Sequence, residues 1–330
     1  MRAYRLYELS MAGLKLVEED MPLPGAGQVL VKVRASSLNF RDFVIINGFF
    51  PMPVAPGRIP LSDGAGEIVA VGNDVHRFAV GDRVVNAFYP NWFGGTFNST
   101  PEQYVTEQDG WLSEYRVVSA EALSRLPDQL SFEEGATLPC AGTTAWAALA
   151  GIGSGDTVLT QGTGGVSLFA VQLAKAAGAR VIATTSSAAK GERLKALGAD
   201  EVIDYVANPE WGESVRALTG GRGVDRIVEV SGPATIGQSI KAIRLGGQIS
   251  LIGILGGHEG GVDYMGMFLS FARFEPITVG SRRDLEDLIR AIDLHKIKPV
   301  IDSQFSFDDA KSAFDKLAQR QLFGKIVVSH

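Results

Sequence analysis

The sequence is poor in the residues that hold metal ions and covalent cross-links. Its 330 residues include one cysteine and four histidines. The single cysteine, Cys140, cannot form a disulfide within the chain, which excludes the disulfide framework of small secreted domains. No apolar run approaches the roughly 18 residues of a membrane-spanning helix, and no basic stretch followed by an apolar one marks a signal peptide. We therefore expect a cytoplasmic protein without a membrane partner.

Basic residues are fewer than acidic ones. The chain carries 31 Lys and Arg against 37 Asp and Glu, a net charge of −6. No block of basic residues stands out, so a nucleic-acid partner has no electrostatic support. Hydrophobic residues make up 45% of the chain, which is typical of a folded globular protein. The length allows roughly two domains, and a small-molecule substrate is the partner we expect.

The first third of the chain shows the pattern of short strands separated by glycine and proline. Residues 28–34 and 66–71 alternate in the manner of strands, which favours a barrel or a strongly bent sheet. Residues 86–115 interrupt this pattern with many aromatic side chains. Two interpretations stay open for them: a long loop with a small core of its own, or a wall of the substrate site.

From about residue 130 the chain alternates strands with helices. Strands are predicted at 157–160, 180–184, 201–204, 225–230 and 247–253, with helices such as 166–177 and 189–197 between them. Such alternation indicates βαβ units and a parallel sheet. A last strand of this sheet is predicted at 277–280, on its edge. An amphipathic helix at 307–317 and a strand at 325–328 close the chain.

The strongest motif is a glycine-rich loop, Gln161-Gly-Thr-Gly-Gly-Val-Ser167. It follows a predicted strand and opens a predicted helix, which is the context of a dinucleotide-binding fingerprint. The glycines allow a tight turn and a close approach to a pyrophosphate, and the helix start directs N–H groups at it. The predicted cofactor contacts are Gly162, Thr163, Gly164, Gly165 and Val166. The alternative is a glycine turn of structural importance only.

The end of the second strand decides between NAD and NADP. An NAD enzyme usually places a carboxylate there to hold the ribose hydroxyls. This chain has Thr184, Thr185, Ser186 and Ser187 instead, followed by the basic residue Lys190. We predict that Thr184, Ser186 and Lys190 receive a 2′-phosphate, and that the cofactor is NADP(H). The alternative is a helix cap formed by Ser186 or Ser187.

Several segments in order resemble the medium-chain dehydrogenase/reductase superfamily. They are Ser37-Leu-Asn-Phe-Arg-Asp42, Gly64-Ala-Gly66, Val80-Gly-Asp-Arg-Val84, Leu138-Pro-Cys-Ala-Gly-Thr-Thr-Ala145 and Phe323-Gly-Lys-Ile-Val-Val328, together with the glycine-rich loop. The chain looks most like the zinc-independent quinone oxidoreductase and enoyl reductase branch.

The resemblance implies an α/β protein of two domains. Residues 1–125, completed by 282–330, would form a GroES-like β-barrel catalytic domain. Residues 126–281 would form a Rossmann domain with a doubly wound parallel sheet, which binds NADP(H). Relatives pair the edge of this sheet across a two-fold axis, so we expect a homodimer.

The resemblance also implies roles for residues of this chain. Asn39, Arg41 and Thr144 would lie beside the nicotinamide or the substrate oxygen, and are the predicted catalytic residues. The remaining predicted cofactor contacts are Ile252, Gly253, Gly324 and Lys325. Structural alternatives stay open: a turn held by Asn39, an ion pair of Arg41 with Asp42, and a solvated strand end at Lys325.

A catalytic zinc needs three protein ligands, usually Cys, His or a carboxylate. The resemblance would place these ligands at Asn39, Ser62 and Cys140, of which only the cysteine is a usual one. We therefore predict no metal. Without a metal, conjugate reduction is favoured, because the enolate or phenolate that it forms spreads its charge and hydrogen bonds can stabilise it.

The predicted function is thus hydride transfer from NADPH to a quinone or an α,β-unsaturated carbonyl. An alcohol dehydrogenase acting on simple aldehydes or ketones is one alternative, and an NADPH-binding protein without catalysis is another. The candidate proton donors are Tyr89, Tyr115, His258 and solvent.

Overall fold

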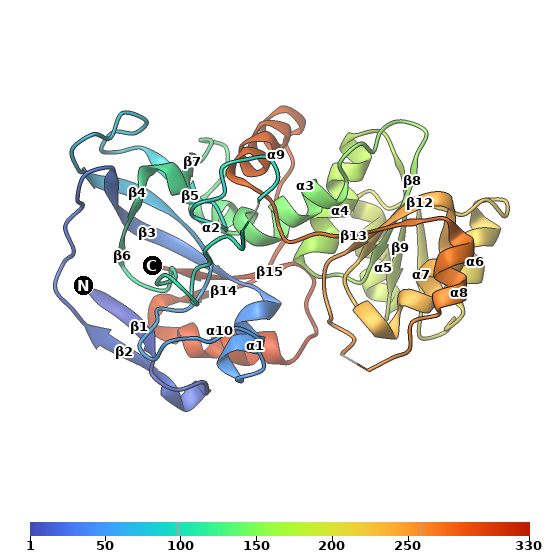
Figure 1. Cartoon of the computed structure of the whole chain (residues 1–330), viewed down its shortest axis with the longest axis horizontal. Coiled ribbons are helices and arrows are strands. Elements are labelled where there is room, and N and C mark those ends of the chain that lie inside the picture. Colours follow the sequence, from blue (N-terminus) through green and yellow to red (C-terminus); the bar gives the residue numbers. More distant parts are fainter. Residues whose placement is uncertain (98, 258) are drawn as a thin grey trace. The chain divides into compact units, whose positions relative to one another are not determined.

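The computed structural model describes residues 1–97, 99–257 and 259–330 (Figure 1). They form two compact units: Met1–Thr143 with Val279–His330, here called the first unit, and Thr144–Thr278, the second unit. Residues 126–143, which we assigned to the Rossmann domain, pack with the first unit. The reason is that α2 (Phe132–Ala136) lies against strands β3 and β4 of that unit. Residues 279–281 also belong to the first unit.

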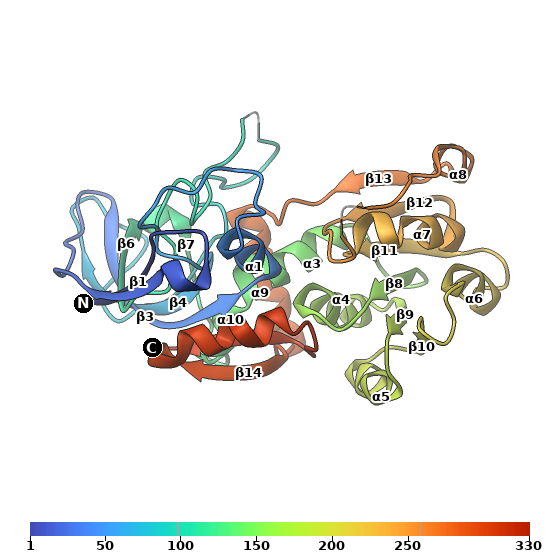
Figure 2. The ribbon, with the colours of Figure 1, turned by 90° about the horizontal axis from the view of Figure 1, so that it is seen from below.

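The first unit is built on a seven-stranded sheet in the order β14-β15-β3-β4-β5-β7, with β6 paired to β3. Its strands are β3 (Gln28–Leu38), β4 (Asp63–Val71), β5 (Arg83–Asn86), β6 (Tyr115–Ser119), β7 (Leu123–Arg125), β14 (Ile301–Ser306) and β15 (Lys325–Ser329). A separate hairpin-like pair joins β1 (Arg2–Leu6) to β2 (Leu14–Glu18). The helices are α1 (Phe40–Ile46), α2, α9 (Arg282–His295) and α10 (Ala310–Ala318), and α10 packs on β14 and β15 (Figure 2).

The core of the first unit absorbs part of the aromatic segment at 86–115. Tyr104 and Trp111 are fully buried, and their ring centroids lie 5.9 Å apart in an edge-on arrangement. Phe93 and Phe97 remain exposed. Tyr104 and Trp111 therefore do not form a separate small core of the segment, because they pack into the main core of the first unit.

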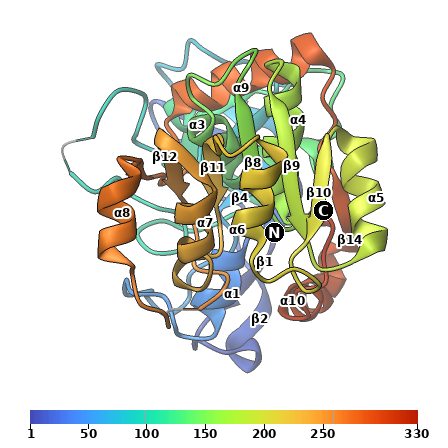
Figure 3. The same ribbon diagram turned by 90° about the vertical axis from the view of Figure 1, so that its right-hand side faces the viewer.

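The second unit is a six-stranded parallel sheet in the order β10-β9-β8-β11-β12-β13 (Figure 3). The strands are β8 (Thr157–Gln161), β9 (Arg180–Thr185), β10 (Glu201–Asp204), β11 (Val224–Glu229), β12 (Ile243–Leu251) and β13 (Arg273–Pro276). The helices are α3 (Thr143–Ala148), which begins at the last residue of the first unit, α4 (Gly165–Ala176), α5 (Ala188–Leu197), α6 (Trp211–Leu218), α7 (Ile236–Ala242) and α8 (Tyr264–Ser270). This strand order is that of a doubly wound Rossmann sheet, whose ligands bind where the order reverses, between β8 and β11.

The edge strand of this sheet lies earlier in the chain than predicted. It is β13, Arg273–Pro276, paired in parallel with β12, whereas residues 277–280 are not a strand. The preceding helix α8, which packs against α7 and β12, exposes Tyr264, Met265 and Phe268. Pairing of this edge in a homodimer stays a prediction. Among the described residues, no helix has the length and apolar character needed to cross a bilayer.

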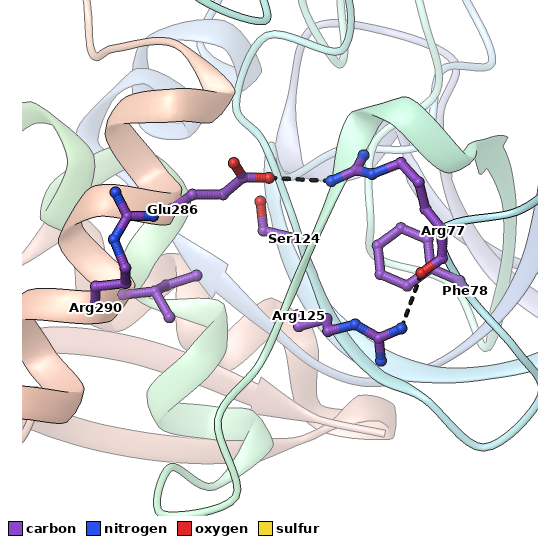
Figure 4. A pocket seen from close by; sticks show the side chains of 7 residues that line it. Arg77, Phe78, Ser124, Arg125, Glu286 and Arg290 are labelled. Carbon is purple, nitrogen blue, oxygen red and sulfur yellow. Dashed lines mark hydrogen bonds and ion pairs between the residues drawn. The ribbon is translucent and has the colours of Figure 1, made fainter.

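A cavity of about 330 Å³ lies in the first unit, between the 77–78 turn, β7 and α9 (Figure 4). Its arginines are engaged by neighbours: Arg77 donates to the carboxylate of Glu286 at 3.0 Å, and Arg125 pairs with Asp82 at 2.7 Å. The Arg125 guanidinium also donates to the backbone carbonyl of Arg77 at 2.8 Å. None of the predicted site residues lines this cavity, and its ion pairs hold the 77–78 turn to α9 and β7 to Asp82.

Candidate active site

The glycine-rich loop forms an open helix start at the end of β8. Gly162 has a φ of +70°, a conformation that favours glycine, and its N–H donates to the carbonyl of Thr184 at 2.9 Å. Gly164 is the N-cap of α4 and supplies no side-chain cap. A Cβ atom added at Gly162 or Gly164 would meet nothing within 4 Å. The loop thus leaves room over the start of a 12-residue helix, which fits a dinucleotide phosphate.

A buried carboxylate joins the ends of β8 and β11, and the sequence analysis missed it. Glu229 is fully buried and accepts five hydrogen bonds from protein donors. The donors are Gln161 Nε2 (2.7 Å), the backbone N–H groups of Ser231 and Gly232 (3.0 Å each), Thr235 Oγ1 (2.6 Å) and Ser239 Oγ. Gln161 is the first residue of the glycine-rich loop, and its carbonyl accepts a hydrogen bond from Ser167 Oγ at 2.6 Å. Glu229 therefore anchors the residue from which the loop starts. The sequence signal was a polar residue at the end of a buried strand.

Ile252 and Gly253, which we predicted to line the nicotinamide site, lie at the carboxyl end of β12, next to the end of β11. Ile252 donates its N–H to the carbonyl of Glu229 at 2.9 Å. A Cβ atom on Gly253 would come within 2.5 Å of the carbonyl oxygen of Val230, so this close approach requires glycine. Because all strands are parallel, Ile252 and Gly253 share the edge of the sheet that carries the glycine-rich loop.

In the segment after β9, one serine forms the helix cap that was the alternative to binding a 2′-phosphate. Ser187 Oγ accepts the backbone N–H of Lys190 at 3.3 Å and caps α5. Thr184 is buried in β9, whereas Ser186 is exposed. Lys190 is half-buried in the first turn of α5, and the contact of Ser186 and Lys190 with a 2′-phosphate stays a prediction.

In the first unit, Asn39 and Lys325 meet in a buried polar cluster. Lys325 Nζ donates to the carbonyl of Leu38 at 2.5 Å and to Asn39 Oδ1. Asn39 Nδ2 in turn donates to Asp63 Oδ2 at 2.9 Å and to Ser62 Oγ at 3.4 Å. The amide of Asn39 therefore connects an ammonium to a carboxylate, which defines the orientation of that amide. We call Asn39, Ser62, Asp63, Cys140 and Lys325 the polar cluster.

Burial dominates the electrostatics of this cluster. Asp63 is fully buried, and burial raises its pKa, although Lys325 and the hydrogen bonds from Asn39 and Ser62 oppose the rise. Burial also raises the pKa of Asp42, in the first turn of α1, to about 6. The pKa of the Cys140 thiol is raised by burial and by the nearby charge of Asp63. Cys140 is therefore a neutral thiol at physiological pH, and not a reactive thiolate.

Arg41 points away from Asn39 towards the aromatic segment. Its guanidinium donates to the carbonyl of Tyr104 at 3.2 Å and to Gln103 Oε1 at 3.1 Å. It also lies over the rings of Phe50 and Phe88, at 5.1 and 5.2 Å from their centroids. These contacts replace the ion pair with Asp42 that we had considered as an alternative.

The structure places the other predicted residues as follows. Thr144 is buried at the start of the second unit. Gly324 has a φ of +119°, and a Cβ atom there would lie 2.3 Å from the carbonyl oxygen of Val300, so the turn into β15 requires glycine. The side chain of Lys325 is engaged in the polar cluster, and its contact with a cofactor stays a prediction. Of the candidate proton donors, His258 lies outside the described residues.

The polar cluster does not fit a catalytic zinc. The three positions expected for the ligands do come together, but they carry an amide, a hydroxyl and a thiol whose pKa is raised. Zinc is held by thiolates, imidazoles and carboxylates. An ammonium also lies against Asn39, and like charges repel. Among the described residues, no group of three or more His, Cys, Asp or Glu side chains is arranged to hold a metal ion.

The folds and the loop together define an oxidoreductase of the two-domain dehydrogenase type, and comparison with known proteins specifies the family. Residues 25–128 match the alcohol dehydrogenase GroES-like domain, and residues 165–293 match the zinc-binding dehydrogenase family. The latter match does not include Asn39, Ser62 or Cys140, so the name of that family carries no information about a metal here. The chain belongs to the medium-chain dehydrogenase/reductase superfamily, in its quinone oxidoreductase-like branch.

Relatives cover nearly the whole chain. A zinc-type alcohol dehydrogenase-like protein of Schizosaccharomyces pombe is 40% identical, over 96% of this chain and 94% of that protein. A chloroplastic quinone oxidoreductase of Triphysaria versicolor is 35% identical, over 98% of this chain and 96% of that protein. The names of these relatives include both alcohol dehydrogenases and quinone oxidoreductases.

Solved structures share the fold. A putative alcohol dehydrogenase of Sinorhizobium meliloti has a TM-score of 0.95 and 40% identity, over 100% of this chain and 98% of that one. An NAD-dependent alcohol dehydrogenase has a TM-score of 0.92 and 33% identity, over 100% of both chains. A mycobacterial protein complexed with NADPH has a TM-score of 0.84 and 28% identity, again over 100% of both chains. The GroES-like and Rossmann domains are thus confirmed, and both nicotinamide cofactors occur among the neighbours.

Proposed function

We propose that this oxidoreductase uses NADPH to reduce quinones or α,β-unsaturated carbonyl compounds, and that it does so without zinc. The single observation that carries the proposal is the composition of the polar cluster. Where a zinc-dependent relative would need three metal ligands, this chain has one thiol, two neutral polar side chains and the ammonium of Lys325.

The product anion explains why this substrate class is favoured. Reduction of a simple carbonyl forms a localised alkoxide, which needs a metal or a strong acid. Conjugate reduction forms an enolate or a phenolate, whose charge is delocalised and which hydrogen-bond donors can stabilise. NADPH, when bound, supplies the hydride to the acceptor carbon or quinone, and a proton from solvent completes the reduction.

In the second unit, residues of the glycine-rich loop and their neighbours would bind and orient the cofactor. The N–H groups at the start of α4 would hold the pyrophosphate, and Glu229 keeps Gln161 and the following loop in place. The absence of a carboxylate among residues 184–187 favours the phosphorylated cofactor.

A substrate panel tests the proposal. Purified protein is incubated with NADPH and, in turn, 1,2-quinones, enones, and simple aldehydes or ketones, and NADPH consumption is followed by absorbance. We expect turnover of quinones or enones that is insensitive to a chelator. Turnover restricted to simple aldehydes, lost on chelation and restored by zinc, would instead establish an alcohol dehydrogenase. NADPH binding without turnover of any acceptor would indicate a protein that binds the cofactor only.

The cofactor preference has its own test at Lys190. Replacing Lys190 by alanine removes a cation next to Ser186, and a charged hydrogen-bond partner is worth about 10–100-fold in affinity. We expect the NADPH dissociation constant to rise by that factor, whereas the NADH constant stays unchanged. Lys195→Ala is the matched control, because it removes a charge from the same helix where Lys195 pairs with Glu192 at 3.0 Å. Equal losses for both cofactors would show that Lys190 does not contact the 2′-phosphate.

A further inference from the structure

The polar cluster contains a buried positive charge that the proposed chemistry has not yet used. The residue Lys325 is 4% exposed, and its Nζ donates to the Leu38 carbonyl and to Asn39 Oδ1. A buried ammonium is costly unless opposite charge and hydrogen bonds compensate it. The nearby opposite charges are Asp63 and Asp42, both buried. The ammonium is therefore the cation that balances an otherwise acidic cluster.

The place of this cation within the cluster is informative. Asn39, which accepts the ammonium, also contacts Ser62 Oγ at 3.4 Å, and Asp63 accepts the backbone N–H of Cys140 at 3.3 Å. Three of these positions, Asn39, Ser62 and Cys140, are the ones that the family resemblance assigns to ligands of a metal. At one of these positions, Asn39, the side chain that would bind a metal ion instead accepts a hydrogen bond from a lysine of β15, far away in the sequence, and the charge of that lysine also acts on the Cys140 thiol.

We infer that the ammonium of Lys325 takes the place of a divalent metal cation in the polar cluster and serves as its permanent, covalently attached cation. The inference deepens the metal-free function proposed above and rests on it. It means that two separate features keep metals out: the loss of ligands at Asn39 and Ser62, and the presence of a competing charge. A change in the ligands alone would not recreate a metal site, because the ammonium would still repel the metal ion.

Two variants separate these features. The double variant Asn39→Cys with Ser62→His supplies a thiolate and an imidazole beside the native Cys140 and Asp63, and keeps Lys325. The triple variant adds Lys325→Leu, which removes the charge and provides no new ligand. Both are titrated with Co²⁺, whose visible absorption and thiolate-to-cobalt band report tetrahedral binding. We expect the triple variant to bind Co²⁺ at least about 100-fold more tightly than the double variant, because it lacks the repulsion between two nearby cations.

Thermal unfolding with and without Co²⁺ provides a second readout. Removal of the ammonium leaves the buried Asp63 without its cation, whereas Asp42 keeps the charge of Arg41 nearby, so the metal-free triple variant should be the less stable of the two, and Co²⁺ should restore its stability. Equal Co²⁺ affinity in the two variants, or no binding and no stabilisation in the triple variant, would overturn the role of Lys325. Zinc measured in equal molar amount in the wild-type protein would instead contradict the metal-free function itself, so the two failures are distinguishable.

Discussion

Replacing Gly164 by aspartate is expected to weaken NADPH binding strongly while leaving the fold intact. Gly164 has φ −77° and ψ 172°, which any residue adopts, and an added Cβ atom meets nothing within 4 Å. Aspartate is also a favoured N-cap residue, and relative to glycine it should stabilise the free protein by about 0.3 kcal/mol. The same carboxylate, however, would lie where the loop is proposed to receive a phosphate. We expect the NADPH dissociation constant to rise by at least about 100-fold, since two anions would share one helix start.

The control is Gly164→Asn, which has nearly the same size and the same capping ability but no charge. Fluorescence titration with NADPH and thermal unfolding of the free protein measure the two effects separately. The asparagine variant should lose less affinity than the aspartate variant, and both should unfold at or above the wild-type temperature. An aspartate variant that binds NADPH as the wild-type does would show that the phosphate does not lie at the start of α4.

The substitution Glu229→Ala is expected to produce the largest loss of stability among single changes in the second unit. It removes the acceptor for five donors and leaves a cavity in a site that water does not reach. Unsatisfied buried donors and lost packing together predict a decrease of about 3–5 kcal/mol in the free energy of unfolding. Because Gln161 loses its anchor, NADPH binding should weaken as well.

Urea denaturation measures this change, with an unaltered dependence on urea concentration as evidence that the unfolding transition is comparable. Glu201→Ala is the matched control, because Glu201 pairs with Arg180 at 3.4 Å at the surface, and such pairs contribute about 1 kcal/mol or less. A Glu229→Ala protein as stable as the control would contradict the anchoring role.

The predictable parts of this protein were those in which neighbours in sequence are neighbours in space. The glycine-rich loop lies between β8 and α4 as expected, because the strand, the turn and the helix follow one another directly. The polar cluster was not predictable as an arrangement, since Asn39 and Lys325 are 286 residues apart. The resemblance placed both residues in the site, but nothing in the sequence predicted that they contact each other directly.

Two errors of detail have physical causes. The strand at the sheet edge was predicted at 277–280, where apolar residues occur, but β13 occupies Arg273–Pro276, whose two charged residues and proline suit an edge. Glu229 was overlooked because its partners are contributed by β8, α7 and the loop before α7, which only the tertiary fold brings together.

The position of β15 has a consequence for the order in which the protein can fold. This strand, Lys325–Ser329, is an interior strand of its sheet, with β14 on one side and β3 on the other, yet it follows the entire second unit in the chain. During synthesis the parallel sheet of the second unit can therefore form before β15 is available to the sheet of the first unit. Until Lys325 emerges from the ribosome, Asp63 lacks its cation and residues 35–38 of β3 lack their partner strand β15, so the first unit can be completed only after the whole second unit has been synthesised.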